Sequence, residues 1–169
     1  MDNKLRIAGI VEESIVDGPG IRFVVFTQGC KHNCPGCHNP HTHSFDGGEI
    51  VEIDSIIDSI KENPLLSGVT LSGGEPFEQA KALAELSKKI KELGYNIISY
   101  TGYTYEYIIE NSSEASGWMD LLKEIDILID GRFEIEKKSL NLRYKGSSNQ
   151  RIIDVKKTMA SGNIVIASI

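Results

Sequence analysis

The chain has 169 residues and a net charge of −6, and its 40% apolar and 25% charged residues are typical of a globular protein in water. We expect a single domain over residues 1–169, shorter than the roughly 250 residues of a complete eight-unit α/β barrel. The negative charge argues against nucleic-acid binding, no apolar run reaches the length of a membrane span, and the amino terminus lacks a secretion signal, so we expect a cytoplasmic protein without nucleic-acid or membrane partners.

Predicted strands and helices alternate along the chain, which is typical of a parallel sheet with crossover helices. The strand at 21–27 is rich in β-branched and aromatic residues and lies between Asp-Gly-Pro-Gly and Gln-Gly-Cys. Four or five βα units predict an α/β fold, a partial (β/α) barrel with a mostly parallel sheet that stays open on one side. Strands are predicted at 5–12, 21–27, 69–72, 95–101, 125–130, 150–154 and 163–168, and helices at 54–63, 76–93, 104–111 and 118–123.

All three cysteines lie in one run, Cys30-Lys-His-Asn-Cys34-Pro-Gly-Cys37, directly after the strand at 21–27. Iron–sulfur clusters of the 4Fe–4S type are normally held by four thiolates, so three cysteines would leave one iron without a protein ligand. An open coordination position is typical of a metal that does chemistry. The carboxyl end of a strand is also where α/β proteins place their sites, so the run predicts a catalytic iron–sulfur loop.

Zinc is the alternative for this loop. The four histidines of the chain all lie within residues 32–43, beside the cysteines, so a closed Cys3His zinc site is compatible with the sequence. The second C-x2-C pair of a zinc ribbon is absent, which favours the iron–sulfur interpretation.

A second loop, Ser72-Gly73-Gly74-Glu75-Pro76, follows the strand at 69–72 and should lie at the same edge of the sheet. Paired glycines let the backbone approach a small ligand closely, and a carboxylate beside backbone carbonyls suits an ammonium group. The alternative interpretation is an ordinary turn followed by a helix cap.

Together these motifs resemble the radical S-adenosylmethionine enzymes, and the similarity extends over about residues 8–154. The segments at 17–22, 28–30 and 37–39 are similar to the activases of glycyl radical enzymes. Those at 101–103, 128–133 and 143–151 are similar to the activating proteins of the anaerobic ribonucleoside-triphosphate reductases. One departure is Gly36, because many relatives carry an aromatic residue just before the third cysteine.

The resemblance implies a single radical S-adenosylmethionine domain with a 4Fe–4S cluster and S-adenosylmethionine as cofactors. The open iron would then bind the amino and carboxylate groups of S-adenosylmethionine. The residues implied are Cys30, Cys34 and Cys37 for the cluster; Gly73, Gly74 and Glu75 for the methionine ammonium; the backbone of Gly36, Cys37 and His38 for adenine; and Ser99 and Thr101 for the ribose or carboxylate. Asp17 is a candidate for contacting the substrate peptide, or else an ordinary turn residue.

The resemblance also implies the reaction and the partners. An electron donor such as flavodoxin would reduce the cluster, and the resulting 5′-deoxyadenosyl radical would take a hydrogen from a glycine of the large catalytic subunit of the anaerobic ribonucleotide reductase. Activation of another glycyl radical enzyme, such as a formate lyase, is the second hypothesis. A zinc-stabilised binding module is the third.

The charge is uneven along the chain. Residues 137–157 hold seven Lys or Arg and one acidic residue, Asp154. Such a run is either a solvated face or a docking surface for an acidic partner, the electron donor or the reductase.

Overall fold

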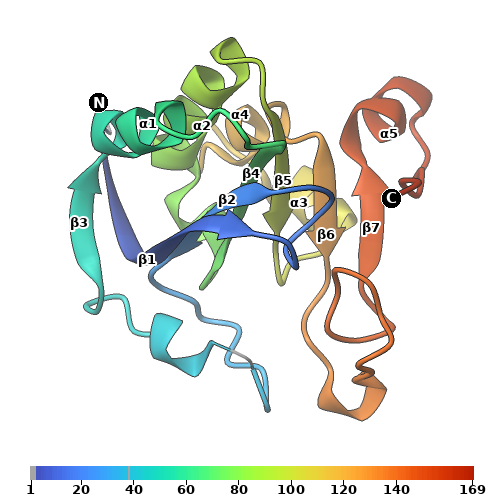
Figure 1. The fold of residues 1–169 in the computed structure, drawn as a ribbon. Helices are drawn as coiled ribbons and strands as arrows, with labels where there is room; N and C mark the ends of the chain where they lie inside the picture. Colours follow the sequence, from blue (N-terminus) through green and yellow to red (C-terminus); the bar gives the residue numbers. More distant parts are fainter. Residues whose placement is uncertain (1–2, 38) are drawn as a thin grey trace.

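The computed structural model describes residues 3–37 and 39–169 and contains one seven-stranded sheet with the strand order β3-β1-β2-β4-β5-β6-β7 (Figure 1). The strands are β1 (Lys4–Ser14), β2 (Arg22–Thr27), β3 (Glu49–Glu52), β4 (Gly68–Gly73), β5 (Asn96–Tyr100), β6 (Ile127–Asp130) and β7 (Arg151–Asp154). The α-helices are α1 (Ile53–Lys61), α2 (Ala80–Glu92), α3 (Tyr105–Asn111), α4 (Trp118–Leu122) and α5 (Val155–Ser161), with 3-10 turns η1 (Pro40–Thr42), η2 (Pro76–Gln79) and η3 (Ile135–Lys137).

The four central strands, β2, β4, β5 and β6, are parallel, and the sheet does not close on itself. This confirms the predicted open α/β fold with a parallel centre. The helices α1, α2 and α4 pack side by side against one face of the sheet (Figure 1). Phe23, Val25 and Leu71 belong to the hydrophobic core between this face and the helices. The alternate residues of the same strands face the other way, as the two-residue period of a strand requires.

Both edges of the sheet differ from the expected parallel arrangement. β1 pairs antiparallel with β2 and β3, and β7 pairs antiparallel with β6. β3 was not predicted, because it has only four residues, Glu-Ile-Val-Glu, of which three are exposed. The predicted strand at 163–168 is wrong, since it contributes only a bridge between Ile166 and Ile153. The helix α5 was also missed, although Asp154 caps its first turn by accepting from Lys157 N at 2.9 Å.

The parallel centre brings four loops to one edge of the sheet, because parallel strands all end at the same side. The cysteine loop follows β2, the Gly-Gly-Glu loop follows β4, and Thr101–Tyr103 follow β5. Residues 131–150, which we call the β6–β7 excursion, follow β6. Among the described residues, none of the helices has the length and apolar character needed to span a membrane.

Candidate functional site

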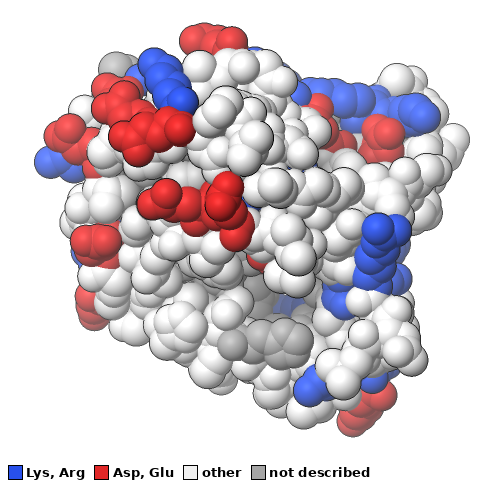
Figure 2. All heavy atoms as spheres, viewed as in Figure 1, with Lys and Arg blue, Asp and Glu red and all other residues white. Residues whose placement is uncertain are grey.

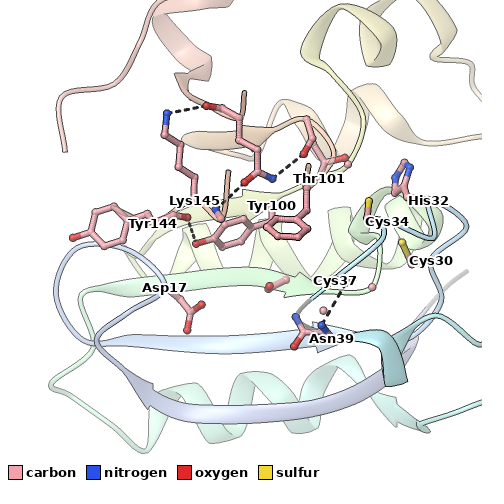
Figure 3. A pocket seen from close by; sticks show the side chains of 18 of the residues that line it. Asp17, Cys30, His32, Cys34, Cys37, Asn39, Tyr100, Thr101, Tyr144 and Lys145 are labelled. Atoms are coloured by element: carbon pink, nitrogen blue, oxygen red, sulfur yellow. Dashed lines mark hydrogen bonds between the residues drawn. The ribbon is translucent and has the colours of Figure 1, made fainter. Parts of the chain in front are cut away.

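The four loops enclose a cavity of about 360 Å³. Figure 3 shows Cys30, Cys34 and His32 toward one end of it and Asp17 with Tyr144 toward the other. The walls come from the cysteine loop, the turn between β1 and β2, the ends of β4 and β5, and the β6–β7 excursion. The predicted site residues that line the cavity are Asp17, Cys30, Cys34, Cys37, Gly73, Gly74 and Thr101.

The three cysteines are partly buried free thiols that share this cavity. Burial raises the pKa of the Cys30 thiol to about 11, and the negative charge of Glu75 adds to this shift. Burial also raises the pKa of Cys34. A metal must therefore displace protons from both thiols when it binds, which couples the affinity for metal to pH.

The donor set fits an iron–sulfur cluster. Three soft thiolates on one cavity wall suit iron–sulfur chemistry. Within 3–37 and 39–169, no three His, Cys, Asp or Glu side chains are arranged to hold one single metal ion. A cubane does not require such convergence, because each cysteine binds a different iron of the cluster.

Backbone contacts fix the cysteine loop onto the Gly-Gly-Glu loop. Glu75 N donates to Gly29 O at 2.8 Å, and Gly74 N donates to Thr27 O at 2.8 Å. A Cβ atom on Gly74 would lie 2.5 Å from Gly29 O, and one on Gly73, whose φ is +99°, would lie 2.4 Å from Thr27 N. Both positions therefore need glycine, because the two loops touch through their main chains.

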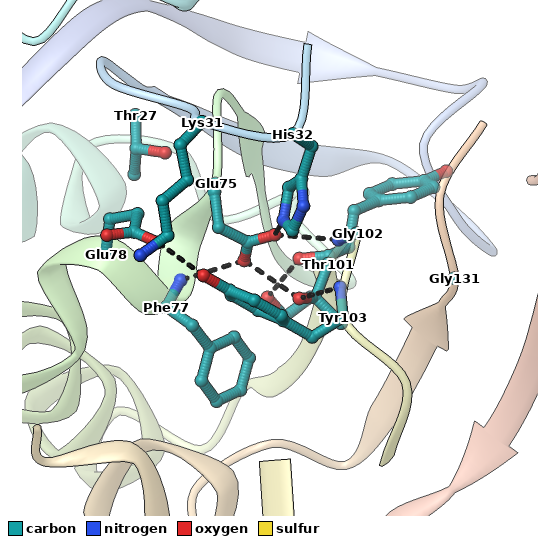
Figure 4. Close-up of polar contacts among 12 residues, drawn as sticks. Thr27, Lys31, His32, Glu75, Phe77, Glu78, Thr101, Gly102, Tyr103 and Gly131 are labelled. Atoms are coloured by element: carbon teal, nitrogen blue, oxygen red, sulfur yellow. Dashed lines mark hydrogen bonds and ion pairs between the residues drawn. The ribbon is translucent and has the colours of Figure 1, made fainter. Parts of the chain in front are cut away.

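The Glu75 carboxylate has partners other than the ammonium group that the sequence led us to expect. Its side chain is fully buried and does not line the cavity. Figure 4 shows it surrounded by His32, Thr101, Gly102 and Phe77, each of which donates a hydrogen bond to it. The carbonyl groups of the Gly-Gly segment, by contrast, belong to residues of the cavity wall.

Asp17 lines the cavity and is held by a chain of side-chain contacts. Its carboxylate accepts from Ser14 Oγ at 2.6 Å, and its carbonyl accepts from Thr70 Oγ1 at 2.8 Å. Thr70 Oγ1 in turn accepts from Arg22 Nε at 2.8 Å. Arg22 is buried, and burial lowers the pKa of its guanidinium to about 10. The Asp-Gly-Pro-Gly turn is thus anchored to Thr70 on β4 and, through it, to Arg22 on β2.

Two other predicted residues, Ser99 and Gly36, do not line the cavity. Ser99 is buried, lies outside the cavity wall and donates to the carbonyl of Tyr100 at 3.1 Å. Gly36 has a φ of +73° and is packed so that a Cβ atom would lie 2.5 Å from Ile135 Cδ1. The positive φ favours glycine at this position, whereas the end of the exposed Ile135 side chain can move aside. His38 lies outside the described residues.

The cavity residues that sequence reasoning missed include Tyr100, Lys145 and Gln150. Tyr100 ends β5, and its hydroxyl donates to Tyr144 O at 2.5 Å, so the strand-end rule that selected Thr101 would also have found it. The Gln150 side chain accepts from Gly146 N at 2.8 Å and donates to Gly131 O at 2.9 Å, which closes the β6–β7 excursion at its base. No local pattern announces that pairing.

Some cations of the basic segment 137–157 are already engaged within the fold. Arg151 binds both Asp130, at 2.5 Å, and Glu106, at 2.6 Å. Lys137 pairs with Glu134 at 3.4 Å, and Lys145 lines the cavity. Basic side chains do gather along the right edge of the view in Figure 2, where Figure 1 places β7 and the excursion. Arg151 is nevertheless part of the fold and not a free docking charge.

The chain is similar to several known proteins. A family described as "4Fe-4S single cluster domain" matches residues 16–153. The anaerobic ribonucleoside-triphosphate reductase-activating protein of Vibrio cholerae is 36% identical over 147 residues, which are 82% of this chain and 90% of that protein. The proteins of the same name from Escherichia coli K12 and Enterobacteria phage T4 are 33% and 31% identical over 80% and 81% of this chain, and 90% and 86% of their own lengths. Among solved structures, QueE from Escherichia coli matches 60% of this chain and 53% of its own, with a TM-score of 0.48 and 17% identity.

Proposed function

Because this chain belongs to the family of anaerobic ribonucleoside-triphosphate reductase-activating proteins, we propose that it generates the glycyl radical of such a reductase. The observation that carries this proposal is the placement of three free thiols on the wall of one cavity, beside a Gly-Gly backbone segment. In this proposal residues 1–169 form one radical S-adenosylmethionine domain. When bound, the cluster and S-adenosylmethionine supply one electron and a 5′-deoxyadenosyl radical that abstracts hydrogen from a glycine.

The chain's own residues supply binding and orientation. Cys30, Cys34 and Cys37 hold the cluster, and the carbonyl groups beside Gly73 and Gly74 accept hydrogen bonds from the methionine ammonium. The backbone around Gly36 and Cys37, with His38, lies against adenine in this proposal, although Gly36 itself is packed on Ile135. Thr101 lines the cavity and is the proposed contact for the ribose or the carboxylate, although its hydroxyl already donates to Glu75 Oε2.

The opposite end of the cavity is suited to the entry of a peptide loop. Val16 and Leu142 line the cavity from the turn between β1 and β2 and from the β6–β7 excursion. Leu140, Ile15 and Val16 are strongly exposed, at 93%, 77% and 72%. Large apolar side chains exposed beside a cavity are typical of a protein-binding surface. We therefore assign an apolar rim, made of Val16 and Leu142 in the cavity wall and of their exposed neighbours along the chain, Ile15 and Leu140, to the glycine-bearing subunit of the reductase, with Asp17 as the polar contact inside the cavity.

The electron comes from a protein such as flavodoxin in this proposal. The loop that carries the cysteines is exposed at Lys31 and Gly36, so a donor can approach the cluster without entering the cavity. A reducing compartment such as the cytoplasm suits three free thiols, because thiols stay reduced there.

The test is anaerobic reconstitution with iron and sulfide, followed by incubation with reductant, S-adenosylmethionine and the large reductase subunit. We expect a brown protein and a glycyl doublet in the electron paramagnetic resonance spectrum. Cys34→Ala should lose both the cluster and the doublet. A colourless zinc protein, or an undiminished doublet from the variant, would contradict the proposal. A formate lyase offered in place of the reductase should give no doublet.

A further inference from the structure

His32 and Glu75 form a buried pair that joins the two loops of the site. His32 lies between Cys30 and Cys34, and Glu75 ends the Gly-Gly-Glu loop. His32 Nε2 lies 2.6 Å from Glu75 Oε1, with side-chain exposures of 4% and 0%. A hydrogen bond to a charged acceptor that is shielded from water is stronger than one at the surface. The pair therefore restrains the middle of the cysteine loop (Figure 4).

The Glu75 carboxylate has no capacity left for a ligand. Besides His32 it accepts from Gly102 N at 2.7 Å on Oε1, and from Thr101 Oγ1 at 2.8 Å and Phe77 N at 3.0 Å on Oε2. An ionised carboxylate offers about four lone-pair positions, and four donors already use them. An ammonium group would have to displace one of these donors and leave it buried without a partner, which is unfavourable.

The imidazole of His32 is also held by shape. A Cβ atom on Gly102 would lie 2.5 Å from His32 Cδ2, so the ring rests directly on the glycine backbone. On another side the ring packs edge-on to Tyr103, with centroids 4.5 Å apart. Tyr103 is fixed in turn by a hydrogen bond from its hydroxyl to Glu78 at 2.6 Å. The residues Thr101-Gly102-Tyr103 after β5 thus pack around His32 and fix the position of its ring.

We propose that His32 and Glu75 are positioning residues that fix Cys30 and Cys34 in the geometry of the bound cluster, and that the Glu75 side chain does not bind the methionine ammonium. The proposal rests on the proposed function in taking the cysteines as cluster ligands. In this proposal the pair acts through the geometry of the loop, although His32 also lines the cavity. It gives Glu75 a role different from the one that its motif suggests.

The test compares His32→Ala with His32→Gln in the full-length protein, with its cluster and after removal of iron by a chelator. The amide of Gln can place an N–H where the histidine places Nε2–H, whereas Ala cannot. Without iron, we expect amide hydrogen exchange in residues 30–37 to rise about tenfold in the Ala variant and to stay near wild type in the Gln variant. Exchange in β4 and β5 should stay unchanged, which shows that the fold is intact. His41→Ala, an exposed histidine of the same loop, is the matched control and should exchange as wild type.

Glu75→Gln separates positioning from ligand binding. If Glu75 positions the loop, this variant exchanges faster at residues 30–37 before any S-adenosylmethionine is added, and the electron paramagnetic resonance signal of its reduced cluster broadens. Weaker S-adenosylmethionine binding with unchanged loop exchange and an unchanged signal would overturn the proposal. So would wild-type exchange in His32→Ala, or equally fast exchange in the Ala and Gln variants. Failure of the wild-type protein to cleave S-adenosylmethionine would instead contradict the proposed function and leave the exchange result standing.

Discussion

The close approach of β4 to β2 at Gly73 makes one substitution especially informative. In Gly73→Ala the new Cβ atom would lie 2.4 Å from Thr27 N and 2.5 Å from Thr27 O, which are main-chain atoms of a buried strand. Unlike the end of a flexible side chain, these atoms cannot move without separating the two strands. Overpacking of this kind costs about 1–3 kcal/mol. The positive φ of +99° adds a backbone cost of about 1–3 kcal/mol for any residue with a side chain.

Gly94 provides the matched control. Its φ is +90°, close to that of Gly73, but a Cβ atom there would have no neighbour within 4 Å. Gly94→Ala therefore carries the backbone cost alone. The difference in the free energy of unfolding between Gly73→Ala and Gly94→Ala therefore isolates the steric cost at position 73, about 1–3 kcal/mol.

Urea denaturation of the iron-free protein, followed by circular dichroism, measures this difference. With a slope of about 2 kcal/mol per molar urea, the midpoint of Gly73→Ala should lie roughly 0.5–1.5 M below that of Gly94→Ala. Midpoints that agree within error would show that the ends of β2 and β4 are not in such close main-chain contact. The steric requirement for glycine at position 73 would then be refuted.

Two further predictions concern the rim and the base of the β6–β7 excursion. Leu140→Asp should raise the KM for the reductase subunit about tenfold and leave the cleavage of S-adenosylmethionine in the absence of the subunit unchanged. The control Leu65→Asp, at a residue that is 67% exposed elsewhere on the surface, should change neither quantity. An unchanged KM in Leu140→Asp would exclude this residue from the docking surface. Arg151→Met should lower stability near pH 7 by about 3 kcal/mol, since it leaves the buried carboxylate of Asp130 unpaired. Arg151 also lowers the pKa of Glu106 from 4.5, so the stabilisation from the Arg151–Glu106 pair is present above pH 4.5 and is lost as the pH falls through the lowered value. The difference in melting temperature between wild type and Arg151→Met should therefore narrow below about pH 4.5. A difference that stays constant with pH would contradict the role of this pair in stability.

The sequence was sufficient for the centre of the fold because its strands are mostly apolar and buried. The parallel strands β2, β4, β5 and β6 and the helix α2 each bury a regular set of side chains, which period and length reveal. The prediction missed the edge strand β3 for the opposite reason. β3 has four residues and mostly exposed side chains, and its pairing with β1 depends on a partner more than 40 residues away. Local sequence does not encode such a contact.

The site was predictable to the level of its loops but not of its side chains. The run Cys30 to Cys37 and the Gly-Gly pair follow from spacing and from the rule that parallel strands end together. The partner of Glu75 could not be inferred, because His32 reaches it only once both loops are folded. The place of Tyr144, which has a φ of +65° and a carbonyl that accepts from Tyr100, could not be inferred from the sequence either.

The β6–β7 excursion leaves the sheet after β6 and returns to it at β7, and Gln150 bonds across its base to Gly131. The catalytic loops lie on other strands and are tied to one another. Recognition of the protein substrate can therefore diverge through those residues of the excursion that do not line the cavity, such as Leu140, with the metal chemistry preserved. Transplanting this stretch between homologous activases, with the Gln150 and Arg151 anchors retained, offers a direct route to redirecting one of them to another target.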